Sequence, residues 1–553
     1  MTNQPVVVVT GGGGGIGAAI AEELGRGGWS VVTVDPLVST DGSTPLPTPE
    51  ETTAGRIVAA GGSARASSAS VTDGEAIRGL FEDLVDELGR LDAVINVAGI
   101  SRPTSYTAGT EADWLGVLAV HLDGYLNVLR AALPIMSAAG HGRILGVTSG
   151  SGWRQADTGA YGCAKRAVAS LTWQLGRQAP AGVVVNAMSP IAVTRMVTEA
   201  LERARGAAGG GSGSSASGGL SLGSMPTPDQ LGPVGAYLMG EDFSAWCSGE
   251  VIFVGGSEVA VVDRPRLLEV VRSDPVTSLA HALEVVTTGA LAPAEAQQAS
   301  NGGINPRFGS IFDESPASHE PSEVSSCAIV TDRPDLAAAV TTALDERGVT
   351  CCTIEVDDLA SGFGAAADAL ASTIERVGSL DAVVVALAGP SPGTGSTSEW
   401  ERVLAEHDGI VAHLHTDAGW VRAVADYADG ADRPVRLVTL TDAVTAGGRS
   451  RAQASAQLAR AARRATRDRV AAFAVSVEVP DASGTRPIGE LVAHLLCSPE
   501  APALCGAELV AGPGWFGLRS HPRPSGSITF GGPGIPGWLD GALRSVVRNA
   551  GTA

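Results

Sequence analysis

The strongest constraint on the fold of this chain is an internal repeat. Leu91–Gly99 reads LDAVINVAG and Leu380–Gly389 reads LDAVVVALAG, while Trp114–Gly124 (WLGVLAVHLDG) matches Trp400–Gly409 (WERVLAEHDG). Matches that recur in the same order along a chain indicate two copies of one fold. The chain has 553 residues, which is also too long for one compact core. We therefore expect two related domains.

The first copy alternates apolar, β-like runs with helix-like segments. The runs that read as strands are Val6–Val9, Val31–Val34, Asp92–Val97, Leu145–Thr148, Val183–Ala187 and Val251–Val254. Strands that alternate with helices of about 10–15 residues imply right-handed βαβ units and a parallel sheet. The predicted fold class is α/β, with two tandem Rossmann-type, doubly wound parallel-sheet domains.

Composition along the chain suggests where the domains begin and end. We expect a catalytic domain over residues 1–284, a linker rich in Ala, Pro, Ser and Gly over 285–326, a second domain over 327–524 and a tail with a short helix over 525–553. Residues 205–224 are also rich in Gly and Ser. Another helix-like and strand-like segment follows them, so we expect a loop inside the first domain.

The overall composition excludes several classes of partner. The formal net charge is −21, which argues against nucleic acid and anionic membranes. No apolar run approaches the ~20 residues of a membrane helix, and no signal peptide is visible. The seven cysteines form no Cys-x-x-Cys pair and read as reduced thiols of a cytoplasmic protein. His407, His413 and His415 lie among acids typical of a helix surface, so we expect no metal.

A glycine-rich turn follows the first strand, where residues 10–17 read TGGGGGIG. Glycines let the backbone approach a pyrophosphate, and the N-terminus of the next helix supplies amide donors. The candidate cofactor contacts in this turn are Gly11, Gly15, Ile16 and Gly17. Asp35 ends the second strand, where a carboxylate accepts from ribose hydroxyls and repels a 2′-phosphate. The predicted cofactor is therefore NAD rather than NADP.

The lysine content singles out one position. Of the 38 basic residues, 37 are Arg, and the single lysine is Lys165. A planar guanidinium does not replace a compact ammonium that must reach both a phenol and a ribose. Lys165 follows Tyr161 by four residues, so on a helix both side chains face the same way. We expect the two to work together in acid–base chemistry, with the ammonium lowering the pKa of the phenol.

These motifs together resemble the classical short-chain dehydrogenase/reductase family over about residues 5–265. The matching segments are the glycine turn, Asn96-Val97-Ala98-Gly99, Ser149 twelve residues before Tyr161, and Ser189–Thr194. In the last of these, Ile191 stands where the family has glycine. The resemblance implies an NAD-dependent enzyme that interconverts a secondary alcohol and a ketone by hydride transfer.

The resemblance also implies a role for each matching residue. Tyr161 would take the alcohol proton with the help of Lys165, and Ser149 would bind the substrate oxygen. The further cofactor contacts it implies are Ser70, Val71, Asn96, Ala98, Gly99, Val193 and Thr194, together with Tyr161 and Lys165 themselves. On the substrate side we expect Trp153, Arg154 and the loop over 196–224.

His121 departs from the common family pattern. Family members often place Asn there to anchor a proton-relay water, and a subset has Val-His-Leu, as in Val120-His121-Leu122 of this chain. A histidine at this position either relays protons or packs in the core, and both interpretations stay open. We count His121 among the candidate catalytic residues.

The second copy resembles a dehydrogenase without its site. Its first turn, Thr331–Leu336, reads TDRPDL and has no glycine, and its acids would repel a pyrophosphate. No Tyr or Lys follows the strand near Leu437–Leu440, where alignment puts Ala or Gln. The distance between copies falls from about 321 residues at Val9/Val330 to 289 at Leu91/Leu380 and 258 at Cys247/Cys505. The second copy is therefore expected to have lost material in two places, between its second and third strands and in the region of the Gly/Ser-rich loop. It is predicted to be a non-catalytic structural partner, with a regulatory or acyl-group-binding site as the alternative.

The substrate class follows from the resemblance alone. The Val-His-Leu helix and the stretch GEVIFVGGSEVA at 249–260 look similar to those of (3R)-hydroxyacyl-CoA dehydrogenases. This resemblance makes a 3-hydroxyacyl thioester the first substrate hypothesis, and a steroid, terpene or aromatic alcohol is the second. A non-catalytic NAD-bound sensor or scaffold is the alternative from another class. Family members pair through their fourth and fifth helices, so the fused copy is expected to cover that face, and two chains would form a homodimer with a pseudo-tetrameric arrangement.

Overall fold

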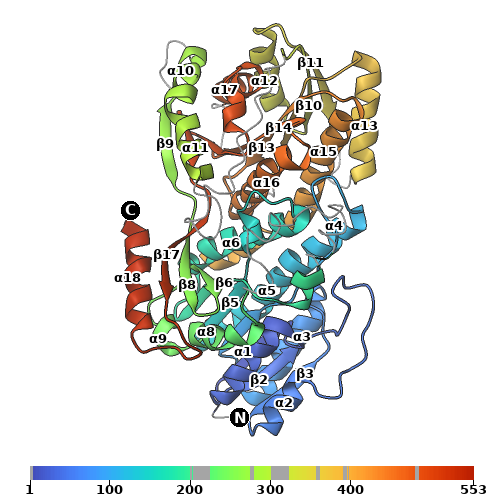
Figure 1. Ribbon diagram of the computed structural model, residues 1–553. Coiled ribbons are helices and arrows are strands. Elements are labelled where there is room, and N and C mark those ends of the chain that lie inside the picture. Colours follow the sequence, from blue (N-terminus) through green and yellow to red (C-terminus); the bar gives the residue numbers. More distant parts are fainter. Residues whose placement is uncertain are drawn as a thin grey trace.

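The computed structural model describes residues 4–199, 202, 225–273, 279–300, 323–356, 362–389, 395, 398–479 and 485–552. Two α/β domains lie one above the other in Figure 1, each built on a mostly parallel sheet. The predicted fold class is therefore confirmed. Among the described helices, none combines the length and the apolar character needed to cross a membrane.

The first sheet has nine strands in the order β17-β8-β7-β6-β5-β4-β1-β2-β3. The strands from β3 to β7 run parallel, and β8 and β17 are antiparallel additions at one edge. Their bounds are β1 Val6–Thr10, β2 Ser30–Val34, β3 Ser63–Ser67, β4 Ala93–Asn96, β5 Gly142–Val147, β6 Val183–Pro190, β7 Val251–Gly255, β8 Glu258–Asp263 and β17 Arg523–Thr529.

Helices cover both faces of this sheet. The strand β1 reads VVVVT and is buried at every residue, which is typical of a parallel strand covered on both sides. The helices α1 and α8 contribute to the core on one face, and α3, α5 and α6 to the core on the other. The helix bounds are α1 Gly15–Arg26, α2 Thr53–Ala59, α3 Gly74–Leu88, α4 Glu111–Leu118, α5 Gly124–Ala139, α6 Gly159–Gln178, α8 Gly232–Leu238 and α9 Glu241–Ser244.

The second sheet has eight strands in the order β11-β10-β12-β13-β14-β15-β16-β9. Over the described residues it repeats the first sheet without a counterpart of β3, which locates part of the expected loss between the second and third strands of this copy. The strand bounds are β9 Leu267–Arg272, β10 Ser326–Thr331, β11 Thr350–Glu355, β12 Ala382–Leu387, β13 Val435–Asp442, β14 Val470–Val477, β15 Glu508–Gly512 and β16 Trp515–Arg519. The helix bounds are α12 Pro334–Asp345, α13 Phe363–Val377, α14 Glu399–Ala405, α15 Ile410–Gly430, α16 Ala446–Ala465 and α17 Thr485–Cys497.

The two halves of the chain exchange their last strands. β9 follows the first domain but pairs with β16 of the second sheet, and β17 follows the second domain but pairs with β8 of the first. In Figure 1 the green β9 rises beside the upper domain, and the red β17 returns to the lower one. Each sheet is thus completed by a strand from the other half.

This exchange cuts across the boundaries expected at residues 284 and 525. The helices α10 (Leu279–Val286) and α11 (Ala292–Ser300) pack on the second domain, so the expected linker begins as helix. Residues 301–322 of that linker lie outside the described part of the chain. The tail helix α18 (Leu539–Thr552) packs against β8, and its Leu539 and Leu543 join the core of the first domain.

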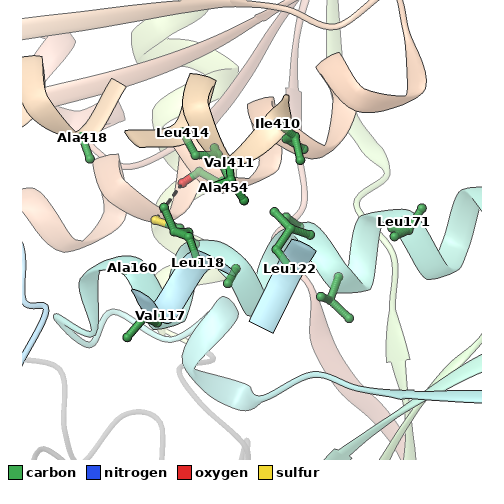
Figure 2. Packing of buried hydrophobic residues seen from close by; sticks show 14 of the residues in the cluster. Val117, Leu118, Leu122, Ala160, Leu171, Ile410, Val411, Leu414, Ala418 and Ala454 are labelled. Atoms are coloured by element: carbon green, nitrogen blue, oxygen red, sulfur yellow. Dashed lines mark hydrogen bonds between the residues drawn. The ribbon is translucent and has the colours of Figure 1, made fainter. Parts of the chain in front are cut away.

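The domains meet through α6 and α16. Buried apolar side chains from both halves form one continuous cluster, in which Leu118 and Leu122 of the first half face Val411 and Leu414 of the second (Figure 2). Across the same contact, Arg166 donates to Glu508 at 2.6 Å, with side-chain exposures of 0% and 3%. The second domain therefore covers the helix that carries Tyr161 and Lys165.

Candidate functional site

The glycine turn closes tightly on itself and opens toward one side. Gly11 has φ of +66°, and a Cβ there would lie 2.8 Å from the backbone nitrogen of Ala98. A Cβ at Gly17 would lie 2.2 Å from the carbonyl oxygen of Gly11, whereas a Cβ at Gly14 would meet nothing within 4 Å. The open side lies at the N-terminus of α1, where a pyrophosphate is stabilised by backbone amides. The turn thus fits a dinucleotide.

Asp35 lies directly beside this turn. Its carboxylate accepts from the backbone nitrogen of Gly13 at 3.0 Å and from that of Leu37 at 2.8 Å. The two bonds hold the carboxylate at the end of β2, where a dinucleotide ribose is expected. Ile16, the next predicted contact, is half-buried and packs on the core beneath α1.

The segment after β4 links the turn to α6. The side chain of Asn96 accepts from the hydroxyl of Thr10 at 2.8 Å, and the same hydroxyl accepts from the Ala98 nitrogen at 3.4 Å. A Cβ at Gly99 would lie 2.6 Å from Cε1 of His121. Asn96, Ala98 and Gly99 are therefore brought between the glycine turn and His121.

The remaining predicted cofactor contacts lie at two other places. Ser70 hydrogen-bonds Thr72 at the surface after β3, while Val71 is buried and its carbonyl accepts from Asn127. Thr194 approaches the turn, because a Cβ at Gly15 would lie 3.8 Å from its Cγ2 atom. The Val193 nitrogen donates to Pro226 at 2.9 Å and the Thr194 hydroxyl accepts from Val197 at 3.2 Å. Most of the expected loop over 196–224 lies outside the described residues.

Lys165 is buried beneath Tyr161 on α6. Its Nζ atom donates to the carbonyl oxygen of Val147 at 2.7 Å and lies 5.7 Å from the centre of the Tyr161 ring. The side chain is buried, and burial lowers the pKa of Lys165 to about 7 because the charged form loses its hydration. Near neutral pH this ammonium is close to its titration midpoint.

The pKa of Tyr161 is shifted upward, opposite to the expectation from sequence. Burial of the phenol raises the pKa, and a hydrogen bond with Ser149 lowers it by less. The ammonium of Lys165 donates its hydrogen bond to the carbonyl oxygen of Val147 rather than to the phenol. Ser149 also accepts from the Ser151 nitrogen at 3.2 Å, which anchors the hydroxyl next to the phenol.

His121 lies on a short π-helical turn, Ala119–Asp123, between α4 and α5. Its Nε2 atom lies 2.8 Å from the carbonyl oxygen of Ile100, and its ring meets the Tyr161 ring edge-on with centres 5.0 Å apart. Burial first, and then the charge of Lys165, lowers the pKa of His121 to about 3. The Nδ1 atom is buried and has no hydrogen-bond partner. His121 is thus a neutral imidazole with one ring nitrogen unused.

Two residues expected on the substrate side differ in burial. Trp153 is buried in a cluster with Trp173 and Phe253. Arg154 is half-buried, its Nε atom has no partner, and burial lowers its pKa to about 10. Sequence patterns do not predict the groups that hold this region, among them the Val147 carbonyl and the Thr148 hydroxyl, which donates to the Lys165 carbonyl at 2.5 Å. A backbone acceptor leaves no signature in residue type.

In the second domain, side chains fill the corresponding region. Asp332 accepts from the Ala388 nitrogen at 2.7 Å, on the segment that corresponds to Asn96–Gly99. Arg451 donates to Asp417 in a buried two-bond ion pair with both distances 2.7 Å, and to the Ala388 carbonyl at 2.6 Å. The guanidinium therefore occupies space beside the counterpart of the cofactor groove.

The helix that corresponds to α6 carries no phenol or ammonium at the matching places. Counted from the first helical residue, Gly448 and Ala452 of α16 stand where Tyr161 and Lys165 stand in α6. His407, the counterpart of His121 in the sequence repeat, lies within 2.7 Å of the Val403 carbonyl and 2.9 Å of the Ser450 hydroxyl.

Among the three histidines near residue 410, His407 and His415 contact different residues. Besides the two partners of His407, the ring of His415 stacks on Phe363 and lies 3.6 Å from Glu111. Over the described ranges, no three His, Cys, Asp or Glu side chains are grouped to hold a metal ion.

Comparison with known proteins covers mainly the first domain. A family model described as short chain dehydrogenase matches residues 5–205. The short-chain reductase protein NovJ of Streptomyces niveus is 32% identical over 258 residues, which are 46% of this chain and 94% of that protein. Acetoacetyl-CoA reductase of Cupriavidus necator is 32% identical over 189 residues, 34% of this chain and 74% of the reductase.

One solved structure resembles both domains together. The N-domain of a bacterial malonyl-CoA reductase with NADP aligns with a TM-score of 0.61 and 15% identity, over 89% of this chain and 95% of that one. At this identity the likeness concerns the fold alone, and it extends to the two-domain arrangement. By its sequence relatives, this chain belongs to the short-chain dehydrogenase family of oxidoreductases, whose members bind a nicotinamide cofactor.

Proposed function

We propose that the first domain is an NAD-dependent dehydrogenase that interconverts a secondary alcohol and a ketone. The observation that carries the proposal is a chain of contacts. Ser149 bonds Tyr161, whose ring lies over Lys165 and against His121, and His121 abuts Gly99 beside the glycine turn. Acid–base groups and a dinucleotide groove are thus contiguous, which an oxidoreductase of this kind requires.

Tyr161 is the proposed proton-transfer residue, acting through its phenol oxygen. Burial raises its pKa, so the phenol is neutral near pH 7 and able to donate a proton to a ketone oxygen. Alcohol oxidation needs the phenolate, which a protonated Lys165 would favour. Ser149, already hydrogen-bonded to the phenol, would hold the substrate oxygen beside it.

The residues proposed to hold NAD are those around the glycine turn, with the amides at the start of α1 on the pyrophosphate and Asp35 on the ribose. When bound, the nicotinamide ring accepts or supplies the hydride. Asp35 supports NAD rather than NADP, because its carboxylate is held in place by two backbone amides and would repel a 2′-phosphate. Ser70, Val71, Val193 and Thr194 remain proposed contacts.

His121 is proposed to act in proton relay rather than as a charged acid. With its pKa lowered to about 3, the imidazole stays neutral under working conditions. One ring nitrogen contacts Ile100, and the other is buried without a partner. A neutral imidazole has one donor and one acceptor nitrogen, so it can pass a proton without carrying lasting charge.

The proposed substrate is a 3-hydroxyacyl thioester. Support comes from the similarity to acetoacetyl-CoA reductase, whose named substrate is a 3-oxoacyl thioester. The second domain is proposed to be non-catalytic, because Arg451, Asp417 and Asp332 fill its groove region. A homodimer of two such chains is the proposed assembly, with the α6 face already covered inside each chain.

The experiment is NADH formation from a panel of 3-hydroxyacyl thioesters and steroid, terpene and aromatic secondary alcohols, by the wild-type chain and Tyr161→Phe. We expect turnover with a thioester and a loss of about 10²- to 10⁴-fold in kcat for the variant. The best substrate in the panel decides the substrate class. Equal inertness of both proteins with NAD still bound would refute the enzyme and support a sensor or scaffold.

A further inference from the structure

A side chain of the second domain reaches the segment that joins Ser149 to Tyr161. Gln457 lies on α16, and its Nε2 atom donates to the carbonyl oxygens of Ser151 at 3.1 Å and Arg154 at 2.9 Å. The side chain is 2% exposed, so water has little access to replace a lost donor. Two hydrogen bonds therefore tie this segment to the other domain.

The amide of Gln457 has a defined orientation. Its Oε1 atom accepts from Nη1 of Arg166 at 3.4 Å, which directs the nitrogen toward the two carbonyls. A Cβ placed at Gly162, the residue after Tyr161, would lie 3.4 Å from Cγ of Gln457 and 2.5 Å from the Thr158 hydroxyl. Glycine at position 162 thus leaves room for Gln457 directly beside the proposed proton donor.

A second connection reaches the same segment from another direction. Tyr106 of the first domain is fully buried and lines a small cavity with Asp417, Val421 and Leu437 of the second domain. Its backbone nitrogen donates to Asp157 at 2.5 Å, within the segment that leads to Tyr161. The neighbouring carbonyls of Thr107 and Gly109 accept from Arg422. The second domain thus holds both loops that flank the start of α6.

We propose that Gln457 is a positioning residue, through which the second domain sets the geometry of residues 150–158 and so of the substrate side of the site. The inference rests on the proposed function of the first domain for its effect on catalysis. A non-catalytic second domain would then be needed for activity in the first. The second domain would thus do more than support the fold of the first, because one identified side chain, Gln457, would carry its effect on the site.

Gln453 provides a matched control. It lies one helical turn before Gln457 on α16, is also buried, and contacts Arg166 and Glu508. Neither of these bonds involves residues 150–158, all of which the structure describes. Replacement of either glutamine removes an acceptor of the buried Arg166 guanidinium at the domain interface. Only replacement of Gln457 also removes the hydrogen bonds to the carbonyls of Ser151 and Arg154.

The first measurement is amide hydrogen exchange of a peptide spanning residues 149–158 in the substrate-free chain. Its amides at Gly152, Trp153 and Arg154 donate to carbonyls of Ser149 and Gly150. We expect exchange about tenfold faster in Gln457→Met and Gln457→Glu, neither of which donates in place of the amide, and a change within about twofold in Gln453→Met. Equal exchange in wild type and both Gln457 variants would overturn the proposal.

The second measurement separates substrate-side geometry from general damage. Displacement of reacting groups by about 1 Å costs up to about 100-fold, so we expect kcat/KM for the alcohol to fall about 10- to 100-fold in Gln457→Met. The KM for NAD should stay within about twofold, and Gln453→Met should keep wild-type kcat/KM. The same loss in both variants would contradict the proposal. An inactive wild type would instead refute the proposed function, while the exchange data would still decide this inference.

Discussion

The ammonium of Lys165 lies 2.7 Å from the carbonyl oxygen of Val147 and 5.7 Å from the ring centre of Tyr161. The only lysine of the chain is therefore buried, and within the described part of the chain its ammonium has one backbone acceptor and no carboxylate bonded to it. Such a position costs stability, because the charged form has lost its hydration. A residue kept at such a cost is consistent with chemistry rather than folding.

Lys165→Met should stabilise the substrate-free protein while abolishing activity. The folded-state pKa of Lys165 is about 7 against 10.5 when unfolded, so below pH 7 the wild type carries the full burial cost of the charge. Between pH 7 and 10.5 the unfolded state binds more protons, and wild-type stability rises with pH. We expect an advantage of about 4 kcal/mol for the variant at pH 7 that vanishes near pH 10.5.

Urea unfolding at several pH values measures this effect, with Arg177→Met on the same helix as a control for the loss of a positive charge. Parallel stability curves for wild type and Lys165→Met between pH 7 and 10 would contradict the assignment of a depressed lysine pKa.

Two replacements of His121 should distinguish the contribution of its hydrogen bond to stability from any contribution of its titration to the pH dependence of activity. His121→Leu leaves the backbone groups of Ile100 unpartnered, which we expect to cost about 1–3 kcal/mol of unfolding free energy. His121→Asn should retain more activity than the leucine variant. Because the pKa of His121 is about 3 and that of Lys165 about 7, an inflection of the pH–rate profile near 7 should persist in His121→Asn. Its disappearance would assign that inflection to the histidine instead.

Replacing only one member of the Arg166–Glu508 pair should lower the free energy of unfolding strongly. Both side chains are buried at the domain contact and lie 2.6 Å apart, so Arg166→Met leaves an unpaired buried carboxylate. We expect a loss of about 3–5 kcal/mol in unfolding free energy, of which Arg166→Met combined with Glu508→Gln recovers a large part. Denaturant unfolding of the single and double variants measures the coupling, and strictly additive losses would count against it.

Asp35→Ser should weaken the proposed preference for NAD. The serine removes the negative charge at the end of β2 but can still accept from a ribose hydroxyl. We expect the ratio of NADP to NAD affinity to rise at least tenfold, that is by about 1.4 kcal/mol. Fluorescence titration with NADH and NADPH gives both constants, and an unchanged ratio would show that another group selects the cofactor.

Local patterns in the sequence predicted the first domain well. The glycine turn, the Asn96–Gly99 segment and the four-residue spacing of Tyr161 and Lys165 each depend on neighbours along the chain, so their physical signals are visible in the sequence. The internal repeat likewise predicted a second sheet and a loss of material between its second and third strands, where the structure has no counterpart of β3 among the described residues.

The strand exchange left no comparable signal. Residues 267–272 (LLEVVR) have the residues of a strand, but edge pairing uses backbone groups that any sequence supplies, so nothing indicates which sheet receives them. The pKa of Tyr161 was mispredicted for a related reason. Its direction depends on total burial and on where the Lys165 ammonium points, and both are tertiary properties. Gln457 could not be predicted from the sequence, because the second domain has no catalytic motif to single it out and its role depends on contacts with the first domain.

Calorimetric titration of NADH into the full chain tests the central claim that one of two similar domains holds the one cofactor site. The matched variant is Gly14→Asp, since Gly14 has extended backbone and open space where a side chain would lie, so the new carboxylate meets the pyrophosphate without distorting the turn. We predict one site per chain in the wild type and affinity weakened at least about 100-fold in the variant. Two sites per chain, or an undiminished site in Gly14→Asp, would contradict the account.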